Sequence, residues 1–422
     1  MRRTLRLLGA CAVLAAVITA AVAAPSQPAA PALAADPVRF VTGWIPNWSS
    51  TVVSEGTRAL NAGLGHENLF AEVSPFAYSA TAAGTISLSG TQTNLDSSIT
   101  TLRNKGLKVV PSITDGTGKG VMAGILADPV TRAQQVAAIV ALVQAKNFDG
   151  IDLDYEGFAF TDGKASWATT KPNWAAFVRE LGATFDTMSP PRMLAVTVPP
   201  IWASGAQGYW VYGWQDPTLS MMPYIDRLRL MVYDWSVGQP GPVAPMSWVN
   251  DVLAYTKATG IDMAKVQVGV PTYGRSWATV TSGTCPVNAS LTTTSVQMEN
   301  ALPLAATKGA SPVRDASGEM KFTYDETFTG SRTTTVPAPV YVPPATRANT
   351  VGPAEPGALK PALRLSPGAT QVTCTVRRTV FYPDTAAVVQ RARAALAAGT
   401  AGIAIWALGY ETPDLWTELA TL

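Results

Sequence analysis

Histidine and cysteine are nearly absent from this chain of 422 residues, which contains one histidine, His66, and three cysteines. A lone histidine makes a Ser-His-Asp triad or a multi-histidine zinc site hard to build. Three cysteines are too few for a cysteine-rich metal site. We therefore expect no metal site and no cofactor, and we interpret His66 as an ordinary surface or core residue.

Charged residues are also scarce, at 14% of the chain, and the formal net charge is only +2. Lysine and arginine residues do not form a cluster, so the sequence does not indicate a nucleic-acid partner. Hydrophobic residues make up 47% of the chain, which is enough for a large core and argues against disorder of the whole chain. One large domain with an insertion, or two domains, would fit this length.

Residues 1–35 have the pattern of a secretory signal peptide followed by a Pro/Ala-rich spacer. Three arginines precede an apolar run that ends in small residues, and cleavage is expected after Ala23 or Ala34. An uncleaved membrane anchor is the alternative. With cleavage, we expect a secreted, extracellular protein that is free of the membrane and monomeric.

Short apolar runs then alternate with helical patterns, as expected of a parallel sheet with crossover helices. Eight runs are predicted to be strands: 40–44, 69–78, 107–113, 148–156, 193–198, 228–234, 266–271 and 402–408. The helical pattern is clearest at 131–145 and 173–188. Eight such units predict an α/β fold, a (β/α)8 TIM barrel with its chemistry at the carboxyl ends of the strands.

Acidic residues alternate with apolar ones in the fourth of these runs. Asp152, Asp154 and Glu156 fall on one face of the predicted strand. Neighbours in that row would lie about 6.6 Å apart. At an effective dielectric constant of about 20, each ionised pair would repel by about 2.5 kcal/mol, equivalent to roughly two pKa units. Such crowding would keep a proton on one carboxyl group near neutral pH, as a general acid requires.

Two other interpretations of this stretch were weighed. A solvated charged surface is disfavoured because large apolar residues alternate with the acids. A calcium-binding loop would use Asp152, Asp154, Glu156 and Gly157, but its last position requires a glutamate and is occupied here by Gly163. The general-acid interpretation is therefore the stronger one.

Asp149, Asp152, Asp154 and Glu156 form the pattern D-x-x-D-x-D-x-E, which resembles the signature of the family 18 glycoside hydrolases, the chitinase family. The stretches 230–234, 269–275 and 402–406 resemble that family's sixth, seventh and eighth strands, so the resemblance covers roughly residues 38–420. It implies a (β/α)8 barrel that cleaves β-1,4 bonds next to N-acetylglucosamine by substrate-assisted catalysis.

The resemblance also implies residue roles. Glu156 would donate the proton to the glycosidic oxygen, Asp154 would orient the substrate acetamido group, and Asp152 would share charge or a proton with Asp154. The remaining carried-over positions concern the substrate. They are Tyr233 as a contact of the acetamido oxygen, Trp406 as the floor under the reacting sugar, and Met231, Asp234, Tyr273 and Arg275 as residues of the substrate cleft.

The chain departs from the family pattern at two places. Its third strand reads Ser112-Ile113-Thr114-Asp115 where chitinases usually have S-x-G-G, and Gly157 follows Glu156 where an aromatic residue is typical. Together with the stretches 75–78 and 198–200, this is similar to the branch that contains spore-cortex and peptidoglycan glucosaminidases.

The barrel is predicted to comprise residues 36–277 and 379–422, interrupted between strands seven and eight by an α+β insertion at 278–378. The insertion has a helical pattern at 296–308, a hairpin at 312–324 and then a Thr/Pro-rich loop.

Cys11 falls in the signal segment, which leaves Cys285 and Cys374 as the only pair in the remaining chain. A disulfide between them, permitted in an exported protein, would close the insertion, and two free thiols are the alternative.

The sequence thus favours a secreted retaining hydrolase whose partner is an N-acetylglucosamine polysaccharide or oligosaccharide, with chitin as the default. A peptidoglycan N-acetylglucosaminidase or an endo-β-N-acetylglucosaminidase is the alternative among enzymes. A non-catalytic, lectin-like chitin-binding protein is the alternative outside enzymes, although Glu156 is present.

Overall fold

A computed structural model describes residues 39–62, 67–203, 207–333 and 369–422. The predicted signal segment, His66 and most of the Thr/Pro-rich loop lie outside the described residues. Within those ranges, no helix has the length and apolar character needed to cross a membrane.

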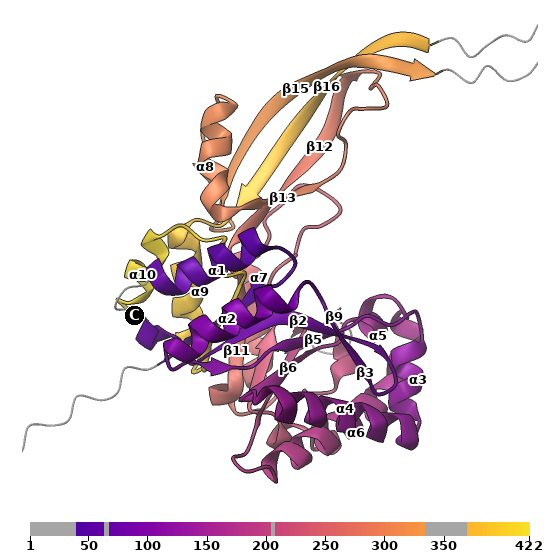
Figure 1. Ribbon diagram of the computed structural model, residues 1–422. Helices are drawn as coiled ribbons and strands as arrows, with labels where there is room; N and C mark the ends of the chain where they lie inside the picture. The colour runs from indigo at the N-terminus through magenta and orange to yellow at the C-terminus, as the bar shows by residue number, and fades with distance from the viewer. Residues whose placement is uncertain (1–38, 63–66, 204–206, 334–368) are drawn as a thin grey trace, which may run out of the picture. The chain divides into compact units, whose positions relative to one another are not determined.

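Eight parallel strands close into a barrel, which confirms the predicted fold (Figure 1). In spatial order around the barrel they are β1 (Val41–Pro46), β2 (Glu72–Ala82), β5 (Ser112–Asp115), β6 (Gly150–Asp154), β7 (Met193–Val198), β10 (Arg227–Leu230), β11 (Val266–Pro271) and β17 (Gly402–Trp406). Pairing of β17 with β1, and of β1 with β2, completes the circle.

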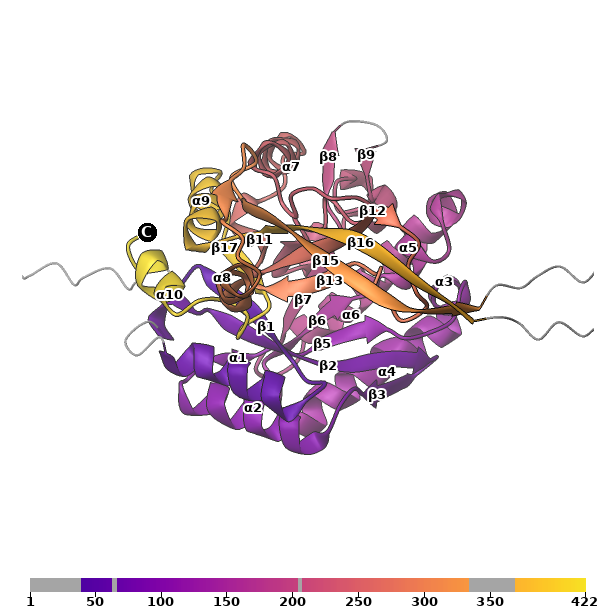
Figure 2. The ribbon, with the colours of Figure 1, turned by 90° about the horizontal axis from the view of Figure 1, so that it is seen from above.

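Helices lie around the strands, as the view in Figure 2 shows. They are α1 (Ser50–Ala62), α2 (Gln92–Asn104), α3 (Val121–Ala127), α4 (Pro129–Lys146), α5 (Gly157–Phe160), α6 (Trp167–Asp186), α7 (Met246–Ala258), α9 (Thr385–Ala397) and α10 (Asp414–Leu419). Short strands β3 (Thr85–Leu88), β4 (Lys108–Val109), β8 (Ile201–Ala203) and β9 (Gln207–Gly208) decorate the barrel.

Helix α4 illustrates how local sequence signals set an element. Asp128 caps it by accepting a hydrogen bond from the backbone of Val130, and Pro129 occupies the first position, where its missing N–H costs nothing. The helix ends at Asn147, which adopts a left-handed conformation with φ of 49°. Helix α4 contains the predicted stretch 131–145, and α6 contains the stretch predicted at 173–188 except for its last two residues.

Three strands are shorter than predicted at their carboxyl ends. Strand β17 stops at Trp406, two residues before the predicted end at Leu408. Strand β6 stops at Asp154, because Glu156 has helical backbone angles and precedes α5. Strand β10 stops at Leu230, and Asp234 has a φ of 61°, which is incompatible with a continuing strand. The prediction that β6 and β10 extend to Glu156 and Asp234 was therefore wrong, and both residues lie on loops at the mouth of the barrel.

Between β11 and β17 the chain forms a second, antiparallel sheet with the order β13-β12-β16-β15-β14. Its elements are β12 (Tyr273–Gly283), β13 (Thr294–Gln297), α8 (Met298–Thr307), β14 (Val313–Arg314), β15 (Met320–Thr333) and β16 (Ala369–Tyr382). A small apolar core, which includes Ala301, Phe322 and Val380, joins α8 to the sheet. The sheet spans residues 273–382, so it is slightly longer at both ends than the insertion predicted at 278–378.

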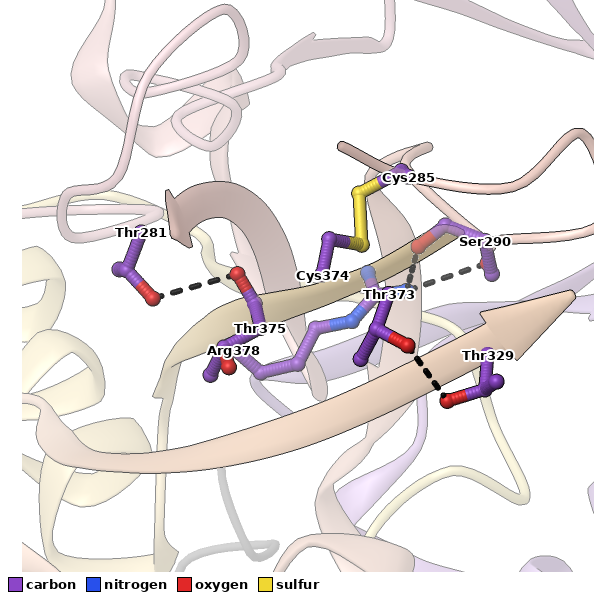
Figure 3. Close-up of a disulfide and its surroundings, with 8 residues drawn as sticks. All are labelled: Thr281, Cys285, Ser290, Thr329, Thr373, Cys374, Thr375 and Arg378. Carbon is purple, nitrogen blue, oxygen red and sulfur yellow. Dashed lines mark hydrogen bonds between the residues drawn. A yellow bond between two sulfur atoms is a disulfide. The ribbon is translucent and has the colours of Figure 1, made fainter. Parts of the chain in front are cut away.

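Cys285 and Cys374 form the predicted disulfide, which links the segment after β12 to β16 (Figure 3). The bond joins residues 89 positions apart, and Cys374 is 1% exposed. Nearby, Arg378 donates to the carbonyl oxygens of Ser290 and Thr292. A cross-link over so long a loop contributes up to about 4 to 5 kcal/mol in the chain-entropy model.

The inside of the barrel is polar around Arg229 of β10, which is fully buried. Its guanidinium donates to Gln267 at 3.0 Å and to Ser74 at 2.7 Å. It also pairs with two buried carboxylates, Glu72 and Asp152, each at 3.2 Å. Since an unpaired buried charge is costly, Arg229 and these acids stabilise one another only as a set.

We predict that Arg229→Met destabilises the folded state by about 3–5 kcal/mol, because the side chain keeps its bulk while Glu72 and Asp152 lose their buried cation. Chemical denaturation followed by tryptophan fluorescence measures the change. Arg377→Met is the matched control, since Arg377 pairs with Asp325 on the exposed face of β16 and β15. Equal midpoints for the two variants would contradict the prediction.

Candidate active site

Strand β6 presents its acids to the barrel interior because the residues between them are apolar. Ile151, Leu153 and Tyr155 are fully buried. Their side chains point away from the barrel axis, toward the surrounding helices. The alternation of a strand then turns Asp152 and Asp154 inward. The predicted common face of these two acids is therefore confirmed, and Glu156 follows them on the loop.

Asp152 lies deepest and has no exposed surface. It accepts hydrogen bonds from Trp44 Nε1 at 2.8 Å, Ser112 Oγ at 2.6 Å and Thr197 Oγ1 at 2.7 Å. Its fourth partner is Arg229. The expected bond from Ser112 to the acid row is thus present, and Asp152 is held rigidly as a buried anion.

Asp154 is 5% exposed and is joined by a side-chain hydrogen bond to Glu156. Its atom Oδ1 is buried, yet it has no hydrogen-bond partner among the described residues. A buried polar atom without a partner is costly, so Oδ1 is suited to receive one from a bound molecule.

The pKa values of both outer acids are raised. For Asp154, burial is the largest cause, followed by the charges of Glu156 and Asp152, while Arg229 acts in the opposite direction. For Glu156, burial also dominates, the hydrogen bond from Asp154 lowers the pKa and Asp234 raises it. The pair therefore retains a shared proton at pH values where exposed carboxylic acids are ionised. Crowding contributes as the sequence analysis expected, but burial contributes more.

A cavity of about 710 Å³ opens above these acids. Its walls combine aromatic side chains with few polar ones, which is typical of a site for a small organic ligand. It is lined by Trp44, Phe76, Asp154, Glu156, Phe160, Thr197, Pro199, Pro200, Trp202, Tyr209, Met231, Tyr233, Asp234, Trp235, Val237, Trp248 and Trp406.

Tyr233 and Met231 line this cavity from the segment after β10. Burial raises the pKa of the Tyr233 hydroxyl well above its usual value, and nearby Tyr273 and Asp154 raise it further. The hydroxyl is therefore protonated and can donate a hydrogen bond. Gly269 makes room for this ring, because a Cβ there would lie 2.9 Å from Tyr233 Cε1 and 2.6 Å from a backbone oxygen.

Asp234 lines the cavity, whereas Tyr273 and Arg275 are not among the described residues that line it. Both instead contact Asp234: the Tyr273 hydroxyl donates at 2.5 Å, and Arg275 forms a two-pronged ion pair at 3.0 and 2.7 Å. Since Tyr273 and Arg275 belong to β12, the insertion sheet fixes a carboxylate of the barrel mouth. Their position thus differs from the direct cleft contact expected.

Trp406 forms part of the cavity wall at the end of β17, within an aromatic cluster. Its ring centroid lies 4.9 Å from Phe76, 5.8 Å from Trp44 and 6.3 Å from Trp48. Trp277, inside β12, instead donates its Nε1–H to the carbonyl oxygen of Val237. The arrangement offers a broad apolar floor beside the acid pair.

The model of the family described as "Glycosyl hydrolases family 18" matches residues 68–411 of this chain. The chain belongs to glycosyl hydrolase family 18. The acids of its D-x-x-D-x-D-x-E pattern lie within the matched range, at residues 149–156.

Relatives agree with this assignment. The "Putative sporulation-specific glycosylase YdhD" of Bacillus subtilis is 24% identical over 198 residues, which are 44% of this chain and 42% of that protein. The chain thus spans less than half the length of this curated relative.

Solved structures show the same fold. A chitinase from Chromobacterium violaceum has a TM-score of 0.64 and 21% identity, covering 90% of this chain and 98% of that one. The Bacillus megaterium spore cortex-lytic enzyme SleL has a TM-score of 0.64 and 15% identity, covering 90% and 73%.

Several site residues of this family 18 enzyme escaped sequence analysis. Arg229 and Thr197 each stand between apolar residues in a barrel strand, and such an isolated polar residue was the available signal. Phe160, Tyr209 and Trp248 had no comparable signal, because they reach the cavity from loops and helices. In the described ranges, no cluster of three or more His, Cys, Asp or Glu is arranged to hold a metal ion.

We predict that Asp234→Asn moves the alkaline limb of the pH–activity profile to lower pH. The protonated form of Glu156 exists below its pKa and is lost as the pH rises through it. Asp234 raises that pKa, so removing its charge lowers it. Initial rates over a pH series measure the shift, with the exposed Asp325→Asn as control. A limb that stays in place or moves to higher pH would refute the prediction.

Proposed function

We propose that this protein is a secreted, retaining glycoside hydrolase that cleaves β-1,4 bonds of N-acetylglucosamine-containing polymers by substrate-assisted catalysis. One observation carries the proposal: the Asp154 side chain is hydrogen-bonded to Glu156, while its buried Oδ1 has no partner among the described residues. An acetamido N–H of the substrate is the donor that this oxygen requires.

The proposed reaction begins when the acetamido oxygen attacks the anomeric carbon of the bound sugar. The bond from that carbon to the glycosidic oxygen breaks, and Glu156 gives the leaving oxygen a proton. Asp154 holds the acetamido N–H and stabilises the cyclic oxazolinium ion. Water then attacks the anomeric carbon from the side of the departed group, and the bond from that carbon to the acetamido oxygen breaks. Glu156 accepts the proton that the water loses. Two inversions leave the β configuration unchanged.

Other cavity residues would bind the sugar in this scheme. Tyr233 donates a hydrogen bond to the acetamido oxygen, which carries partial negative charge before it attacks. Trp406 supplies an apolar surface for the C–H bonds of the reacting ring. Asp234, held by Tyr273 and Arg275, is left with a defined orientation toward a sugar hydroxyl.

Secretion is supported by the signal-peptide pattern of residues 1–35 and by the disulfide between Cys285 and Cys374, since such bonds persist mainly in oxidising compartments. Chitin or its oligosaccharides are the default substrate, supported by the likeness to a bacterial chitinase. Peptidoglycan is the second candidate, supported by the likeness to a sporulation glycosylase and a cortex-lytic enzyme.

We predict that Glu156→Gln lowers kcat by about 10²–10⁴-fold, because the amide occupies the same volume but cannot supply the proton. Binding of an oligosaccharide, measured by calorimetry, should change little. Glu418→Gln on the exposed face of α10 is the matched control and should keep wild-type turnover. An active Glu156→Gln variant would remove the acid assignment.

Product analysis tests the stereochemistry and the substrate. NMR of the first product formed should show the β-anomer, and an initial α-anomer would contradict the acetamide mechanism. Mass spectrometry of digests of chitin oligomers and of purified peptidoglycan, run in parallel, identifies the polymer that is cut. If glucosaminyl-ended fragments are released from peptidoglycan while chitin oligomers stay intact, peptidoglycan is the substrate.

A further inference from the structure

Gly157, the residue after Glu156, occupies a position where a side chain would clash with its surroundings. A Cβ added there would lie 2.2 Å from Oδ2 of Asp115 and 3.1 Å from its Cγ. Real Cβ atoms do not approach so closely, so either Asp115 or the backbone at 156–157 would have to move. Asp115 stands at the end of β5, the strand next to β6 in the barrel.

Asp115 is itself held in place by hydrogen bonds from two residues. Oδ1 accepts hydrogen bonds from the backbone N–H of Thr117 at 2.9 Å and from its hydroxyl at 2.7 Å. The carboxylate also accepts the backbone N–H of Gly157. That N–H belongs to the first turn of α5, where no carbonyl of the helix can accept it. The pair Asp115 and Gly157 therefore forms one fitted contact.

A second contact ties the same two loops together. The backbone N–H of Gly120, after β5, donates to Asp162 at 2.6 Å, and Asp162 follows α5. The backbone of α5 in turn begins on Glu156, whose carbonyl accepts from Ala159 and Phe160. Asp115 at the end of β5 and Gly120 in the loop after it thus contact the chain at both ends of α5, the short helix that follows Glu156.

We propose that Asp115 is a positioning residue for Glu156: by receiving the Gly157 N–H in space that only glycine leaves open, it sets the backbone from which the acid reaches the glycosidic oxygen. The inference rests on the proposed function, in which Glu156 is the proton donor. Asp115 is not among the described residues that line the cavity, so it acts through the backbone and does not touch the substrate.

The contact also explains both departures of this chain from the family pattern seen in its sequence. A carboxylate stands where glycine is usual on the third strand, and glycine stands where an aromatic residue usually follows the acid. The first change requires the second, because the Asp115 carboxylate fills the volume that a side chain at position 157 would occupy. The two positions therefore form a matched pair in this enzyme.

The test is a double-mutant cycle of Gly157→Ala and Asp115→Gly, assayed on two substrates. One is an unmodified chito-oligosaccharide, whose leaving alcohol needs a proton, and the other is its dinitrophenyl glycoside, whose leaving phenolate needs almost none. Gly157→Ala should lower kcat on the oligosaccharide by about tenfold or more, with KM within about threefold, because the acid is misplaced. The dinitrophenyl glycoside should lose less than about threefold.

Adding Asp115→Gly to Gly157→Ala should raise kcat on the oligosaccharide again, since the opposing carboxylate is gone. Gly124→Ala is the control for the methyl group, because a Cβ at Gly124 in α3 meets no atom within 4 Å. Equal losses on both substrates, strictly additive effects, or a Gly157→Ala variant as active as Gly124→Ala would each overturn the proposal.

Asp115→Asn gives a second test if Gly157→Ala does not fold, as judged by circular dichroism. It preserves size while weakening the bond to the Gly157 N–H, and the same selective loss on the oligosaccharide is expected. Unchanged kcat in this variant would overturn the proposal. A wild-type enzyme that hydrolyses neither substrate would instead refute the proposed function, which is a distinguishable result.

Discussion

This barrel depends on the ion pairs that the buried guanidinium of Arg229 forms with carboxylates in its interior. The guanidinium lies among Glu72, Asp152 and Gln267, with no exposed surface. Without a cation at this depth, two carboxylates inside a ring of apolar strands would carry an uncompensated desolvation cost. With it, Asp152 becomes a fixed anion beneath Asp154, and acids can line the path from the barrel centre to its mouth.

Asp152 influences the protonation of the two outer acids, Asp154 and Glu156. Burial and the charge of Asp152 favour a proton on Asp154, and the hydrogen bond between Asp154 and Glu156 divides that proton over the outer pair. Asp234 adds negative charge from the loop after β10, where Tyr273 and Arg275 hold it. The insertion sheet is thereby part of the site's electrostatics, although none of its strands belongs to the barrel.

The sequence predicted the strands well where apolar runs were continuous, and poorly where they ended. Val266–Pro271 and Met193–Val198 match their predicted bounds because both faces of these parallel strands are buried. The ends at Asp154 and Leu230 were overestimated, because the residues that follow belong to a mouth where backbone hydrogen bonds to neighbouring strands stop. Alternation alone does not report where pairing ends.

By itself, the sequence determined the strand-helix alternation, the acid pattern around Glu156 and the pairing of Cys285 with Cys374. These depend on local periodicity, on a short motif and on a count of two cysteines. Only the tertiary structure decided that Arg229 neutralises the barrel acids, that Tyr273 and Arg275 reach the cavity through Asp234, and that Asp115 fits against Gly157. Each of these contacts joins segments that are distant in the sequence, and they come close only once the barrel has closed.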